Sequence, residues 1–122
     1  LESLQYLNVF GNALYGSMPE SLGGLENLGK LFLQKNDLTG TIPESLAQLS
    51  RLQVLSLGNQ GLTGTIPDDL FKITTLEWLF LDANSLTGTV PEFRSNIGIQ
   101  RIDLALNALE GTIPESLYTQ GR

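Results

Sequence analysis

The sequence contains no cysteine and no histidine. Without cysteine the chain cannot form a disulfide, and it has no thiolate to serve as a nucleophile or a metal ligand. Without histidine it lacks the side chain that most often acts as a general base, as a pH switch or as a metal ligand. It also has no metal-ligand spacing and no phosphate-binding loop. We therefore expect no catalytic residues, no metal site and no cofactor.

Positive charge is also scarce, because 7 Lys and Arg stand against 13 Asp and Glu, for a formal net charge of −6. This balance argues against nucleic acid as a partner, since neutralising phosphates takes a surplus of cations. It equally disfavours an anionic membrane surface. No apolar run is long enough to span a bilayer, so we expect no direct membrane insertion within this segment.

What the sequence does have is a repeat of about 24 residues, which divides it into five units: 1–24, 25–48, 49–72, 73–95 and 96–119. A fixed period of this size is typical of a solenoid, in which each unit buries its apolar face only against its neighbours. The chain starts at the first residue of a repeat, so we expect it to be a segment of a longer protein.

Each unit contains a Leu-x-Leu step or its equivalent at its seventh and ninth positions. This period of two predicts a short strand with both apolar side chains directed inward. Stacked units then form a parallel sheet, and the rest of each unit supplies the crossover that parallel strands need. The inward pairs are Leu7/Val9, Leu31/Leu33, Leu55/Leu57, Leu79/Leu81 and Ile102/Leu104.

The twelfth position carries an asparagine in four units: Asn12, Asn36, Asn84 and Asn107. A polar side chain at a turn next to buried leucines must be hydrogen-bonded, and we expect its partners to be backbone groups of adjacent turns. Gln60 takes this place in the third unit, where we expect a looser turn.

Glycine recurs at the sixteenth position and proline at the nineteenth. The glycine suits a tight bend, and the proline suits the first turn of a short helix, where its missing N–H has no effect. The fourth unit is one residue short, so we expect Phe93 to replace its inward leucine and to distort the back of the array locally.

Together these positions spell Leu-x-x-Leu-x-x-Leu-x-Leu-x-x-Asn-x-Leu-Thr-Gly-x-Ile-Pro-x-x-Leu. Residues 1–119 resemble the plant-specific class of leucine-rich repeats, whose hallmark recurs in the segments 38–43, 62–67 and 86–91. The resemblance implies an α/β solenoid, a right-handed horseshoe or twisted array. In that fold a parallel sheet lines the concave face, a second small sheet follows it, and short 3₁₀ or α turns make the convex face.

The resemblance also implies a ligand-sensing ectodomain of a receptor-like kinase or receptor-like protein, or a secreted inhibitor. An extracellular or cell-surface location follows from it. The paired-cysteine caps of such proteins are missing here, and there is no Asn-x-Ser/Thr glycosylation site.

On an inward Leu-x-Leu strand, the intervening residues point outward and build the concave surface. Five of the nine aromatic residues fall on these outward positions, and aromatics on a rigid sheet dominate binding hot spots. The alternative is that strands simply favour aromatics, which pack across the sheet without a ligand. The predicted ligand-binding residues are Tyr6, Asn8, Phe10, Lys30, Phe32, Gln34, Lys35, Trp78, Phe80, Asp82, Arg101 and Asp103.

Two further ladders favour a structural interpretation over a functional one. An acidic residue follows each proline, at Glu20, Glu44, Asp68, Glu92 and Glu115. A carboxylate there suits the first turn of a helix, whereas a basic partner or calcium is the less favoured alternative. A hydroxyl column on the second sheet reflects strand propensity and solvation. It consists of Ser17, Thr41, Thr65, Thr89 and Thr112.

The sequence thus predicts a non-catalytic module that binds a protein or peptide through its concave face, in a receptor-like or secreted sensor. The alternative is a structural or scaffold subunit of a larger assembly, held by its ends, edges and convex face. The terminal units have no polar cap, so we expect flanking repeats, caps or partner subunits to cover both ends.

Overall fold

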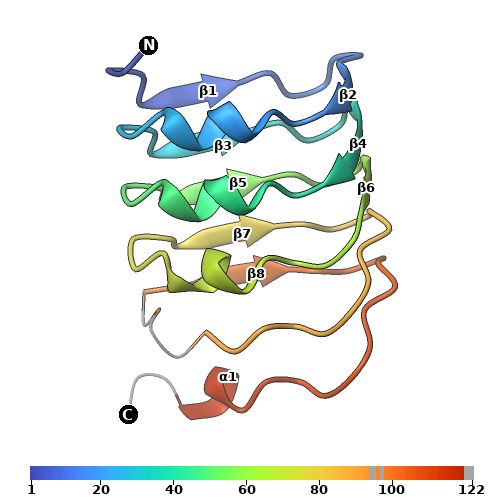
Figure 1. Cartoon of the computed structure of the whole chain (residues 1–122). Coiled ribbons are helices and arrows are strands. Elements are labelled where there is room, and N and C mark those ends of the chain that lie inside the picture. Colours follow the sequence, from blue (N-terminus) through green and yellow to red (C-terminus); the bar gives the residue numbers. More distant parts are fainter. Residues whose placement is uncertain (94–95, 97, 120–122) are drawn as a thin grey trace.

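The computed structural model describes residues 1–93, 96 and 98–119, which wind into a solenoid with one strand of the main sheet in each turn (Figure 1). The main sheet contains β1 (Tyr6–Asn8), β3 (Lys30–Phe32), β5 (Val54–Ser56), β7 (Trp78–Phe80) and β8 (Arg101–Asp103). All of its pairings are parallel, in the order β1-β3-β5-β7-β8. The predicted parallel sheet of Leu-x-Leu strands is confirmed.

A second parallel sheet has the order β2-β4-β6, from β2 (Tyr15–Ser17), β4 (Asp37–Thr41) and β6 (Gly61–Thr63). Isolated bridges Thr65↔Thr87 and Thr89↔Glu110 continue this pairing into the last two units. The Leu-Thr-Gly segments supply a β-branched threonine to this pairing. The glycine at the sixteenth position of each of the five units has φ between 75° and 87°.

Three 3₁₀ helices form the back of the array: η1 (Glu20–Gly24), η2 (Glu44–Gln48) and η3 (Asp68–Lys72). Each proline immediately precedes its helix as the N-cap residue, so it caps the helix rather than occupying its first turn. The fifth unit has a short α-helix instead, α1 (Ser116–Thr119). No helix in the described part of the chain is long and apolar enough to cross a bilayer.

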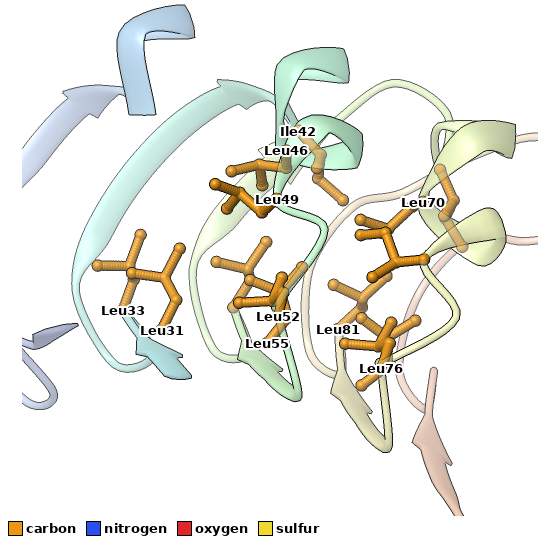
Figure 2. Close-up of a cluster of buried hydrophobic side chains, with 14 of the residues drawn as sticks. Leu31, Leu33, Ile42, Leu46, Leu49, Leu52, Leu55, Leu70, Leu76 and Leu81 are labelled. Carbon is orange, nitrogen blue, oxygen red and sulfur yellow. The ribbon is translucent and has the colours of Figure 1, made fainter. Parts of the chain in front are cut away.

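The core lies between the main sheet and the convex helices (Figure 2). Leu31 and Leu55 come from the strands, and Leu46 and Leu70 come from the 3₁₀ helices; all four are fully buried. Because each unit contributes leucines at the same positions of the repeat, the leucines stack in columns along the solenoid. Burial of each such side chain contributes roughly 1.5–3 kcal/mol to stability.

The asparagine ladder joins each unit to the one before it. The Asn84 amide donates to the carbonyls of Leu57 and Leu81, and its oxygen accepts from the N–H of Leu62. Asn36 and Asn107 bond in the same pattern. The predicted bonding to adjacent turns is therefore confirmed. Asn12 is exposed and donates only to its own turn.

Gln60, in the third unit, makes only some of the hydrogen bonds that the asparagine makes in the other units. Its oxygen accepts from Leu38 N–H at 3.2 Å, and its amide donates to its own turn at the Leu57 carbonyl over 3.4 Å. The structure gives its amide no bond to the preceding unit, whereas the Asn84 amide makes one to Leu57. The third turn is thus less tightly joined to its neighbour, as the sequence predicts.

Phe93 is buried in the short fourth unit and stacks on Phe71 with ring centroids 5.3 Å apart. It therefore fills the place of the inward leucine, as predicted. The buried Asn96 begins the fifth unit and donates to the carbonyls of Ile73 and Leu76. The local distortion expected at the back of this unit stays a prediction, because residues 94, 95 and 97 lie outside the described residues.

Core positions of the terminal units are open to solvent. Leu1 is 92% exposed at one end, and Ile113 is 65% exposed at the other. A hollow of about 380 Å³ next to Ile113 is lined by core residues, including Phe93, Ile102 and Leu104. The expected exposure of core side chains is confirmed, and the covering of these ends by other segments stays a prediction.

Candidate functional site

The register of the main sheet aligns the outward side chains in rows across the concave face. One row joins Tyr6, Lys30, Val54, Trp78 and Arg101, and the next joins Asn8, Phe32, Ser56, Phe80 and Asp103. Phe10, Gln34, Lys35 and Asp82 follow directly after their strands. All twelve predicted residues therefore belong to β1, β3, β7 and β8 or to the turns that follow them, and none comes from β5, which lies between β3 and β7.

Aromatic side chains form two pairs, one on each side of β5. Tyr6 and Phe32 have ring centroids 5.7 Å apart, and Trp78 and Phe80 meet edge to face at 6.4 Å. Such pairs contribute about 0.5–1.5 kcal/mol beyond area burial. The rings therefore stabilise one another without a ligand, and yet Tyr6 is still 53% exposed and Trp78 44%.

Two cations lie over aromatic rings of this face. The Lys35 ammonium is 5.6 Å from the centroid of the Phe10 ring, and the Arg101 guanidinium is 5.2 Å from that of Phe80. Cation–π attraction at exposed sites is worth about 0.5–1 kcal/mol. These contacts hold the two cations against the sheet and leave their hydrogen-bond donors available to a partner.

The charges of the concave face do not pair with one another. Among the described residues the structure gives one salt bridge, Lys72–Asp69 at 2.7 Å, which lies on η3 at the back of the array. There the hydrogen bond and negative charge of Asp69 raise the pKa of Lys72. Asp103 instead uses its carboxylate to accept a hydrogen bond from the N–H of Ala105.

The middle strand, β5, provides a strip of small residues that the sequence-based site did not include. Val54, Ser56 and Gly58 are buried, whereas Phe32 and Phe80, which flank Ser56 in the sheet, are half-buried. A Cβ at Gly58 would lie 2.6 Å from Oδ1 of Asp82, so the missing side chain leaves room for that carboxylate. The signal was present in the sequence as a change from large to small residues at the outward positions of the third unit.

Gln34 lies beside this strip and carries an unsatisfied acceptor. Its Oε1 is buried and is the one such side-chain atom without a hydrogen-bond partner among the described residues. An unsatisfied buried acceptor costs about 1–3 kcal/mol. A partner that donates a hydrogen bond at this position would recover part of that energy.

The two ladders on the other faces have the predicted positions. Glu20, Glu44 and Asp68 each begin a 3₁₀ helix, which agrees with the structural interpretation. Thr41, Thr65 and Thr89 are exposed along the second sheet. In the part of the chain that the structure describes, no three Asp or Glu residues come together in a way that could hold a metal ion.

Comparisons with known proteins agree with this architecture. Leucine-rich-repeat family models match residues 26–86 and 3–25. A comparison with curated proteins finds no match.

Three solved structures illustrate the similarity. The plant peptide hormone receptor RGFR1 in complex with RGF2 is 36% identical over 96% of this chain, with a TM-score of 0.93. The Arabidopsis thaliana BIR3–SERK2 complex is 37% identical over 91% of this chain, with a TM-score of 0.85. A plant ice-binding protein is 34% identical over 93% of this chain, with a TM-score of 0.89.

The chain spans only part of those structures, namely 19%, 60% and 37% of their respective lengths. The family models match half of the chain in one continuous block and most of its first unit in another. The chain therefore belongs to the leucine-rich-repeat family, and its repeats resemble those of plant receptor ectodomains.

Proposed function

We propose that the chain is a non-catalytic recognition module that binds a protein or peptide through its concave face, as part of a receptor-like or secreted sensor. The observation that carries the proposal is the grouping of exposed aromatic rings and unpaired charges on one rigid sheet. Aromatic and arginine side chains are the types most enriched in binding hot spots. Similar repeats belong to a peptide hormone receptor and to a complex of two proteins.

The test is affinity capture from a native extract, with the whole protein as bait. The Trp78→Ala/Phe80→Ala variant removes the aromatic pair next to β5. Tyr15→Ala is the matched control, because Tyr15 is 87% exposed but belongs to the second sheet. Circular dichroism first establishes that each variant folds.

We expect specific partners to be lost with the double variant and retained with Tyr15→Ala. An unchanged set of partners would contradict recognition by the concave face. It would favour the alternative of a scaffold subunit held by its ends, edges and convex face.

A second candidate function, ice binding, rests on the threonines of the second sheet. Thr63 and Thr87 donate to the carbonyls of Gly40 and Gly64 in the preceding units. The methyl group of Thr65 lies against Gly88, where a Cβ would be only 2.9 Å from it. Hydroxyl and methyl groups are thus held at strand intervals of about 4.8 Å. The carboxylates of Glu44 and Asp68 lie beside Thr65.

In this candidate function the methyl groups restrict the orientation of first-shell water, and the hydroxyl groups offer it hydrogen-bond acceptors. One of the similar solved structures is a plant ice-binding protein. The test is inhibition of ice recrystallisation by the whole protein. If the array binds ice, the Thr63→Lys/Thr65→Lys variant loses this inhibition. The control Thr74→Lys, outside the array, keeps it. Absence of inhibition by the unmodified protein would reject this candidate function.

A further inference from the structure

The proposed concave site has a distinct centre, a strip formed by Val54 and Ser56 on β5 and by Gly58, which follows that strand. All three residues are buried. Phe32 on β3 and Phe80 on β7 flank Ser56 in the same row of the sheet. Because neighbouring strands lie about 4.8 Å apart, the backbones that carry the two rings are about 10 Å apart. A partner that contacts this strip therefore meets small groups between two aromatic rings.

Charges of opposite sign stand on the two sides of this central strip. Lys35 follows β3, and its ammonium lies on the side of Phe10, away from the strip. Asp82 follows β7, and its carboxylate lies against Gly58. The structure gives no salt bridge between them, so each charge is available to a partner.

Other charged residues of the concave face follow the same separation of positive from negative charge. On the β3 side, Lys30 adds a second positive charge. On the β7 side, Asp103 adds a second negative charge, and Glu77 precedes β7. The exception is Arg101, whose guanidinium lies over Phe80. The face is thus net positive toward β3 and net negative toward β7 and β8.

We infer that this face selects an extended peptide segment in which an apolar side chain is flanked by an acidic side chain toward β3 and a basic side chain toward β7. In an extended chain, side chains on one side recur every two residues, about 6.6 Å. Positions i, i+2 and i+4 therefore span about 13 Å. In the inferred pose the apolar residue lies over the strip, with the acidic side chain toward Lys35 and the basic side chain toward Asp82.

Charge complementarity carries the choice of a peptide over a neutral sugar, because opposite charges across an interface fix register and exclude wrong partners. The inference rests on the proposed recognition through the concave face and narrows it to one class of ligand.

The test uses a phage-displayed library of random nonapeptides, selected on the whole protein. We expect enriched peptides to carry an acid and a base four residues apart, in either chain direction, with an apolar residue between them. A synthetic peptide from this set should bind Lys35→Glu roughly tenfold more weakly, since reversal turns a weak attraction into a repulsion of similar size. Changing the acid of the peptide to lysine should restore binding to that variant.

The same peptide should lose binding to Asp82→Lys and regain it when its base is changed to glutamate. Rescue by the reversed peptide shows that the variants are folded. If Trp78→Ala/Phe80→Ala abolishes binding but charge reversal has no effect, the charge pattern is wrong and concave recognition stands. If neither change matters, or if no peptide is enriched, both the inference and the proposed peptide recognition are contradicted.

Discussion

Two adjacent glycines in η1 allow a sharp test of how the convex side packs. A Cβ built at Gly23 would lie 2.3 Å from the backbone oxygen of Ser45 and 2.8 Å from its carbonyl carbon. A Cβ at Gly24 would meet nothing within 4 Å. Gly23 thus allows η1 and η2 to approach closely, whereas Gly24 has no such role.

We expect Gly23→Ala to destabilise the protein by about 1–3 kcal/mol, because overpacking against a backbone group can be relieved only by separating the helices. Gly24→Ala should be neutral or stabilising by up to about 1 kcal/mol, because alanine restricts the unfolded chain. The two variants add the same methyl group to neighbouring positions, so composition and propensity hardly distinguish them.

Urea denaturation followed by circular dichroism measures the difference in the free energy of unfolding. Hydrogen exchange localises it, because solenoid units are coupled mainly to their neighbours. In Gly23→Ala, protection should fall first at the amides of Leu22 and Leu46, which bond within η1 and η2. Equal stability of the two variants would refute the close packing of these helices.

The asparagine ladder gives two further predictions. Asn84→Ala should destabilise the protein by roughly 2–4 kcal/mol, because it removes the hydrogen bonds to the carbonyls of Leu57 and Leu81 and leaves the N–H of Leu62 without its acceptor. Asn12→Ala at the exposed end should change stability by less than about 1 kcal/mol. Comparable losses in urea denaturation would contradict this. Gln60→Asn should stabilise the third turn by about 0.5–1.5 kcal/mol by restoring the bond to the preceding unit, and an unchanged or lower melting temperature would count against that account.

Much of the fold could be predicted because each position of the repeat has one dominant physical requirement. Alternating leucines fix the strands, and an asparagine beside buried leucines has to bond to the backbone, as Asn36 and Asn84 do. The missing residue of the fourth unit even identified Phe93 as a core side chain. These inferences need only local spacing and the stacking of identical units.

The candidate site was harder to predict from the sequence, because it depends on side-chain conformations across three or more strands. The sequence predicted that Lys35 and Asp82 lie on the concave face. It did not predict where their charged groups point. It also gave no sign that the Oε1 atom of Gln34 lacks a hydrogen-bond partner. Proline positions were predicted one step too far into the helix, because a cap and a first turn share the same sequence signal.

Hydroxyl-radical footprinting of the whole protein with a retained partner tests concave recognition most directly. The concave side chains of Tyr6, Phe10 and Trp78 are 44–53% exposed, so each has surface that a partner can cover. Tyr15 and Tyr118, on other faces, are 87% and 62% exposed and serve as internal controls. Protection of the three concave residues with unchanged labelling of Tyr15 and Tyr118 is the predicted result. Protection of the two control tyrosines, with the concave aromatics still fully labelled, would contradict the account.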